Sequence, residues 1–270
     1  MKNTIRKTLL ACAATAAMGV SVSASADTIF QDFTVNANLG GTNAIFVADK
    51  MTGNYTEIID FTNTGKFHVE LYWKAAAFVK NDGKTQLDAG DTGLGVNYGI
   101  YALYSADGDF SVNNGKTTFT FKPGTGSLSV FLDPNRNTSY ETANLSNFVA
   151  TGTAGDILLA KGNPIAGEGE LNPGLSTCSR TTNTGINCGS FGSTTSFELT
   201  SDGSKFFTAP NPFYPLSFQS GQLNNFSATG RQIVNGSLDV VFDVPEPTSV
   251  ALLGLGLIGL GLSRRRSKKA

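Results

Sequence analysis

The stretch Lys66–Lys74, KFHVELYWK, has the clearest alternation of apolar and polar residues in the chain. Its odd positions from Phe67 to Trp73 are all apolar, whereas its even positions from His68 to Lys74 carry a polar or charged group. Successive side chains of a strand point to opposite faces, so this pattern predicts a half-buried β-strand. His68 would then lie on the wetter face of that strand.

Other short segments have the same character. Tyr98–Tyr104 is apolar on both faces, which is typical of a central strand covered on both sides. Thr117–Phe121 and Ser127–Leu132 alternate on either side of a Gly-containing turn, which predicts a hairpin. Ser237–Asp243 would be the last strand, with its apolar side chains inward. The Ala75–Ala77 run could hold a helical turn.

Between these segments the chain is rich in Gly, Asn, Asp, Ser and Thr, and it shows no convincing helical period. Many short alternating strands separated by turn residues indicate an all-β domain. We therefore predict an antiparallel β-sandwich of jelly-roll-like form.

The N-terminus has the three parts of a secretory signal peptide. A basic start, residues 2–7, precedes an Ala-rich apolar stretch over residues 8–22 that is too short to span a membrane as a helix. Ala24 and Ala26 supply the small residues that signal peptidase recognises. The predicted cleavage site lies between Ala26 and Asp27.

The C-terminus combines a strand-breaking motif, a short apolar run and a basic end. Val244-Pro245-Glu246-Pro247 would end a strand, because proline lacks a backbone donor and fixes φ. As a helix, the uncharged run 248–262 would cover about three-quarters of a ~30 Å hydrocarbon core. The basic end consists of Arg264, Arg265, Arg266, Lys268 and Lys269. It would stay cytoplasmic, so the preceding domain would lie outside.

This order of Pro245-Glu246-Pro247, a Gly/Leu-rich helix and Arg264-Arg265-Arg266 resembles the PEP-CTERM sorting signal. The resemblance covers about the last tenth of the chain. It implies processing by an exosortase-like membrane protease and transient passage through the inner membrane of a Gram-negative bacterium. It also implies delivery to the cell surface or extracellular matrix.

The chain therefore divides into a signal peptide (1–26), a β-rich extracellular domain (27–243) and a sorting signal (244–270). The whole chain carries 20 basic and 21 acidic residues. Removing both ends leaves 12 basic against 20 acidic residues, a net charge of −8 for the domain. A domain this acidic repels phosphate backbones, so we expect no nucleic-acid partner.

Two cysteines remain after the signal peptide, because Cys12 leaves with it. An even pair in an exported chain predicts a disulfide between Cys178 and Cys188, which would close a loop rich in Ser, Thr, Asn and Gly. A metal site is the alternative, but the sole histidine, His68, is far away in sequence.

The sequence offers little support for catalysis, and we expect a protein that is not an enzyme. His68 is the only candidate imidazole base, and no G-x-S-x-G motif is present. A glycosidase needs only two carboxylates, and Glu168 and Glu170 form the nearest pair. They lie in a Gly/Pro-rich segment that we interpret as a solvated loop.

We expect no cofactor, and two binding hypotheses stay open. Calcium favours hard oxygen ligands on loops, as at Asp82, Asp88 and Asp91 or at Asp107 and Asp109, although ordinary turn chemistry also explains these residues. The second hypothesis concerns an aromatic segment interrupted by prolines, which could stack on sugars or, in the interpretation we favour, cap one end of the core. Its rings are Phe206, Phe207, Phe213, Tyr214 and Phe218.

The body of the chain is similar to the flocculation-associated PEP-CTERM protein family. The similarity rests on residues 48–57 (ADKMTGNYTE), 97–104 (NYGIYALY), 130–135 (VFLDPN) and 206–214 (FFTAPNPFY). It implies a non-enzymatic role in flocculation or biofilm cohesion, with exopolysaccharide or neighbouring cells as partners. A secreted polysaccharide-modifying enzyme and a passive surface protein are the alternatives.

Overall fold

The computed structural model describes residues 30–141, 149–178, 187–220, 223–224 and 226–242. Strands dominate this part of the chain, so the all-β prediction is confirmed. The described helices are single turns: η1 (Ala37–Gly40), α2 (Ala89–Thr92) and α3 (Gly203–Phe206). The predicted signal peptide and the whole predicted sorting signal, residues 244–270, lie outside the described residues.

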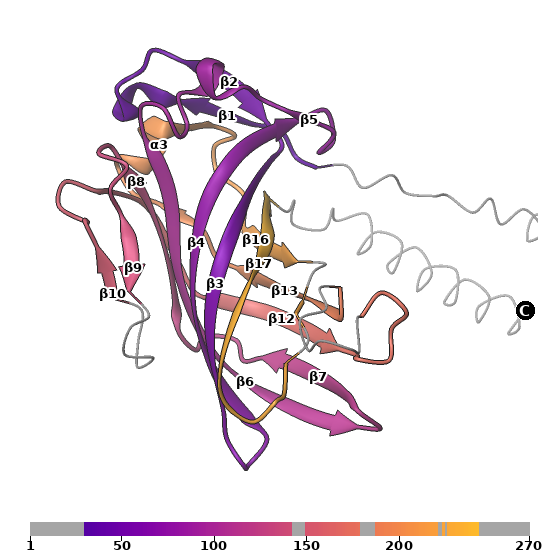
Figure 1. Ribbon diagram of the computed structural model, residues 1–270. Coiled ribbons are helices and arrows are strands. Elements are labelled where there is room, and N and C mark those ends of the chain that lie inside the picture. The colour runs from indigo at the N-terminus through magenta and orange to yellow at the C-terminus, as the bar shows by residue number, and fades with distance from the viewer. Residues whose placement is uncertain (1–29, 142–148, 179–186, 221–222, 225, 243–270) are drawn as a thin grey trace, which may run out of the picture.

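Eight antiparallel strands form a closed barrel (Figure 1). In ring order they are β3 (Lys50–Phe61), β4 (Lys66–Lys80), β6 (Gly99–Asn113), β7 (Lys116–Phe121), β12 (Pro164–Leu171), β13 (Gly189–Thr195), β16 (Leu216–Ser220) and β17 (Gly230–Phe242). β17 pairs again with β3 and closes the ring. The predicted jelly-roll-like sandwich is not confirmed, because one sheet curls round on itself.

The long strand β6 makes this closure possible. One edge pairs with β8 (Ser127–Asp133) over residues 99–105 and with β7 over residues 108–113. The other edge pairs with β4 over residues 101–109. At Gly108, the first residue of β6 that pairs with β7, a Cβ atom would overlap the Phe67 ring, so only glycine lets the strands approach this closely.

The strand at Lys66–Lys74 is confirmed as part of β4, and its odd positions face the core. The helical turn expected at Ala75–Ala77 is wrong, because β4 continues through it to Lys80. The segments around 117–121 and 127–132 are strands as predicted, but they do not pair with each other. Both pair with β6 instead, so the predicted hairpin is wrong.

Smaller elements extend the barrel. β11 (Ile157–Gly162) and β14 (Glu198–Leu199) continue the sheet beyond β8, and β5 (Thr85–Gln86) pairs with the end of β4. β9 (Ser139–Glu141) and β10 (Val149–Thr151) form a separate hairpin. A three-stranded sheet contains β1 (Phe33–Asn36), β2 (Ile45–Ala48) and β15 (Phe207–Ala209). It lies across one end of the barrel, at the top of Figure 1.

Aromatic side chains join this end sheet to the barrel. The buried Phe33 ring contacts Phe78 and Phe242 of the barrel, with ring centroids 6.3 and 4.8 Å away, and also Phe207 and Phe213. Phe206 and Phe207 of the proline-interrupted segment are buried and Phe213 packs against the same core, so these rings cap one end of the core as the favoured interpretation predicts, whereas Phe218 lies in the barrel strand β16.

Candidate functional site

The sorting and cleavage residues predicted from the sequence lie outside the described residues. They are Ala24, Ala26 and Asp27 for cleavage, and Val244, Pro245, Glu246, Pro247, Arg264, Arg265 and Arg266 for sorting. Within the ranges that the structure does describe, no helix has the length and apolar composition needed to cross a membrane.

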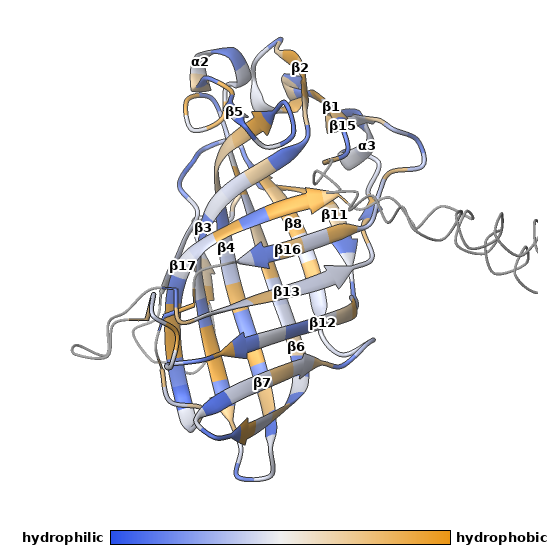
Figure 2. Ribbon diagram, turned by 90° about the vertical axis from the view of Figure 1, so that its right-hand side faces the viewer, coloured by the Kyte–Doolittle hydropathy of each residue, from blue (hydrophilic) through white to orange (hydrophobic). Residues whose placement is uncertain are grey.

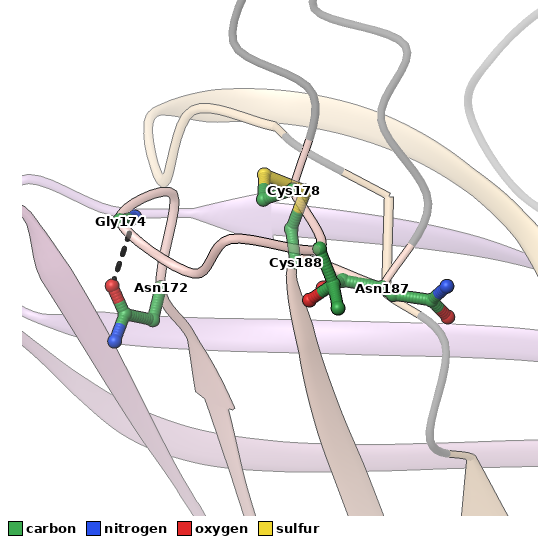
Figure 3. Close-up of a disulfide and its surroundings, with 6 residues drawn as sticks. Asn172, Gly174, Cys178, Asn187 and Cys188 are labelled. Atoms are coloured by element: carbon green, nitrogen blue, oxygen red, sulfur yellow. Dashed lines mark hydrogen bonds between the residues drawn. A yellow bond between two sulfur atoms is a disulfide. The ribbon is translucent and has the colours of Figure 1, made fainter.

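The predicted disulfide is present and lies beyond the ends of β12 and β13 (Figure 3). The Cys178 and Cys188 sulfurs are bonded, and both side chains are buried. The Asn172 amide donates to the Cys188 carbonyl at 2.7 Å, and the Cys188 amide donates to the Leu223 carbonyl at 2.9 Å. The disulfide closes the loop between β12 and β13, and the Cys188 backbone links the end of that loop to Leu223 in the β16–β17 connection.

The calcium candidates are spread over separate elements. Asp82 lies in the turn after β4, while Asp88 and Asp91 lie at the start of α2. Asp107 lies on the exposed face of β6, where its Oδ1 is 2.7 Å from His68 Nδ1, and the Asp109 carboxylate lies 3.1 Å from Lys122 Nζ. Among the residues with described positions, no group of three or more His, Cys, Asp or Glu side chains could hold a metal ion.

Glu168 and Glu170 lie in strand β12 rather than in the loop predicted from the sequence. Both side chains point outward, opposite Thr120 and Thr118 of β7. Glu170 pairs with Lys116, Oε2 to Nζ 2.6 Å.

The outer side of β7, β12, β13 and β16 forms a surface that we call the polar face. These strands cross the front of the molecule in Figure 2. The outward residues of the polar face are Thr118, Thr120, Glu168, Glu170, Ser190, Gly192, Thr194 and Gln219. They line an open hollow of about 1070 Å³.

Strand register explains the hollow. Thr120, Glu168, Gly192 and Gln219 are direct cross-strand neighbours in one row. Adjacent strands lie about 4.8 Å apart, so the row presents hydroxyl, carboxylate and amide groups at regular intervals. Gly192 has no side chain, so the surface is recessed at the middle of the row. The arrangement offers many hydrogen-bonding groups over an area larger than a single small molecule needs.

Sequence reasoning missed Glu57, the most unusual carboxyl group of the described chain. It points into the barrel from β3 and is 4% exposed. Burial raises its pKa from 4.5 to about 8, so the folded protein keeps this carboxyl group protonated at neutral pH. The alternation of Tyr55, Ile59 and Phe61 on the same face of β3 was the signal that could have found it.

Comparison with protein-family models finds the PEP-CTERM protein-sorting motif at residues 243–266. The match confirms the motif predicted at Pro245-Glu246-Pro247 and Arg264-Arg265-Arg266. It indicates an exported protein that an exosortase-type system of a Gram-negative bacterium recognises and sorts to the cell surface. Comparisons with curated proteins and with solved structures found no match.

Proposed function

We propose that this exported protein promotes flocculation or biofilm cohesion by binding exopolysaccharide on its polar face. The hollow over β7, β12, β13 and β16 is the observation that carries the proposal. Its open shape suits an extended chain that enters and leaves at the edges, whereas small-molecule sites enclose most of their ligand.

The chemistry of the polar face suits a polyhydroxylated polymer. Thr118, Thr120 and Thr194 supply hydroxyl groups that both donate and accept hydrogen bonds, and Gln219 adds an amide. Glu168 adds an acceptor for sugar hydroxyl donors. Individually weak contacts repeated along a polymer give strong retention through multivalency.

A binding experiment tests the site directly. Purified wild-type protein is passed over immobilised exopolysaccharide from the producing strain, beside the variants Gly192→Leu and Gly90→Leu. Gly192→Leu puts a side chain into the hollow, and its Cβ would be 3.3 Å from one backbone oxygen. Gly90 lies in α2 and has open space around it, so its variant is a matched control.

We expect the Gly192→Leu variant to lose at least tenfold in affinity while the Gly90→Leu variant binds like wild type. Equal binding by both variants would place the polysaccharide elsewhere. No binding by the wild-type protein would remove this role altogether.

A genetic experiment separates cohesion from the two alternatives. A deletion strain is complemented with the full chain, with the Gly192→Leu variant, or with a chain ending at Asp243, and its settling is measured. Restoration by the full chain alone supports cohesion that depends on both sorting and the polar face. Normal settling in the deletion strain would favour a passive surface protein, and altered polysaccharide chain length would favour an enzyme acting through Glu168 and Glu170.

A further inference from the structure

A small cavity lies on the inner side of the barrel wall whose outer side carries the polar face, and the rings of Phe119, Phe121 and Phe191 border both. Glu57 of β3 contributes the carboxyl group in its lining, and the rings of Phe67, Phe119, Phe121 and Phe191 form much of the remainder. Its volume is about 20 Å³, which is room for one water-sized group.

The Glu57 carboxyl group has no hydrogen bond or ion pair with any residue that the structure describes. Its surroundings hold two further polar groups. The Tyr55 hydroxyl is buried, and the Ser220 side chain approaches it without reaching hydrogen-bond geometry. The Tyr104 hydroxyl is bonded to the Ser193 Oγ at 2.8 Å. Burial disfavours the charged form of this carboxyl group, and a cation beside it would offset that cost.

The lining favours one class of partner. Phenyl rings present electron-rich faces, which attract a cation, and a desolvated carboxylate attracts it more strongly still. The rings stand edge to face around the cavity: Phe67 and Phe121 have centroids 5.3 Å apart at 89°. Metal ions such as calcium take six to eight oxygen ligands, and one carboxylate among rings does not supply them. An ammonium group needs only a few acceptors and tolerates apolar contact.

We propose that this cavity binds an ammonium ion, paired with Glu57 and bordered by the phenylalanine rings. The size of the cavity sets the upper limit on the ligand. This inference does not depend on polysaccharide binding, because the Glu168 side chain of the polar face points to the outer side of the barrel wall.

The proposal carries a characteristic pH dependence. Glu57 acts on the nearby phenols of Tyr55 from β3 and Tyr104 from β6, and burial raises the pKa of both phenols, so they stay neutral. The cation must displace the Glu57 proton, and burial raises the pKa of that carboxyl group to about 8. Binding therefore tightens almost tenfold from pH 6 to pH 7, and then levels above pH 8.

The test uses the purified full chain and the rise of its melting temperature with ammonium chloride, with sodium chloride lowered to keep ionic strength constant. We expect a saturable rise, and an apparent Kd that falls almost tenfold between pH 6 and pH 7. The Glu57→Gln variant should lose the rise, whereas Glu168→Gln, at an exposed carboxylate, should keep it. Near-ultraviolet circular dichroism checks that Glu57→Gln is folded.

Three results would overturn the proposal. The first is no response of the wild-type protein, which would leave the cavity to water. The second is an equal response of Glu57→Gln, which would show that the carboxyl group is not the anchor. The third is an equal response to methanol or to tetramethylammonium, which would show that neither charge nor size is selected.

Discussion

Replacing Glu57 by Gln should make the protein progressively more stable than wild type as the pH rises. Glu57 is buried without a charged partner among the described residues, and its pKa rises from 4.5 to about 8 on folding. Below pH 4.5 both the folded and the unfolded chain hold the proton, so the group contributes no pH dependence. Between pH 4.5 and pH 8 only the folded chain holds it, and wild-type stability falls by ~1.4 kcal/mol per pH unit.

The total effect follows from these two values. Because only the unfolded chain loses the Glu57 proton between these two pKa values, the free energy of unfolding of the wild-type protein falls by about 4 to 5 kcal/mol by pH 8. It falls little further at higher pH. The glutamine amide that replaces the carboxyl group does not titrate in either state, so the variant escapes this loss. The variant also buries an amide without a partner, which adds an offset that is constant with pH. The diagnostic quantity is therefore the slope of the stability difference against pH.

Urea denaturation at pH 5, 6, 7 and 8 measures that slope. Trp73 is the single tryptophan and is 1% exposed, so its fluorescence reports unfolding directly. Glu168→Gln is the matched control, because this carboxylate is exposed on β12, and its difference from wild type should stay within ~0.5 kcal/mol throughout. A Glu57→Gln difference that is the same at pH 5 and pH 8 would refute the reasoning, since Glu57 would then be charged in the fold or hydrated.

Three further substitutions test the architecture. Replacing both Cys178 and Cys188 by Ala should lower the free energy of unfolding by about 2 to 3 kcal/mol, because the unfolded chain regains the entropy of an open loop; unchanged urea denaturation would contradict this. Phe33→Ala should cost about 3 to 5 kcal/mol, because it empties the centre of an aromatic cluster, and a loss under 1 kcal/mol would show that the end sheet contributes little. Gly108→Val should sharply reduce soluble yield and melting temperature, because its side chain overlaps the Phe67 ring, whereas Thr118→Val on the exposed face should not.

The sequence predicts strands well where one face meets the core and the other meets water. β4 is such a strand, and the alternation of apolar and polar residues in its sequence was sufficient to predict it. Which strands pair with one another was harder to predict from the sequence. Asn114-Gly115, whose residues have φ of 51° and 79°, is a two-residue hairpin signal that joins β6 to β7. Overlooking it led to the wrong hairpin. β8 pairs with the other half of the same edge of β6. Its residues are distant in sequence from that edge, and no short sequence motif predicts the pairing.

β12 shows why the rest of the site was hidden. Its sequence, PIAGEGEL, alternates glycine with larger residues, and glycine is depleted in strands, so it was interpreted as a loop. The glycines become understandable only in the barrel. A Cβ at Gly167 would be 2.8 Å from Phe121, and one at Gly169 would be 3.3 Å from Phe119. The inward positions are empty because rings from β7 fill that space.

The alternation of outward and inward residues along β12 places the two proposed sites on opposite sides of the barrel wall. The outward residues of β12, Glu168 and Glu170, belong to the polar face, while its inward glycines admit the rings of Phe119 and Phe121 that line the interior cavity. A side chain added at Gly192 changes the outer surface, and a neutral side chain at position 57 changes only the interior. The two sites therefore share the rings of Phe119, Phe121 and Phe191 but not the polar groups that would bind each ligand, so each proposal can fail without the other.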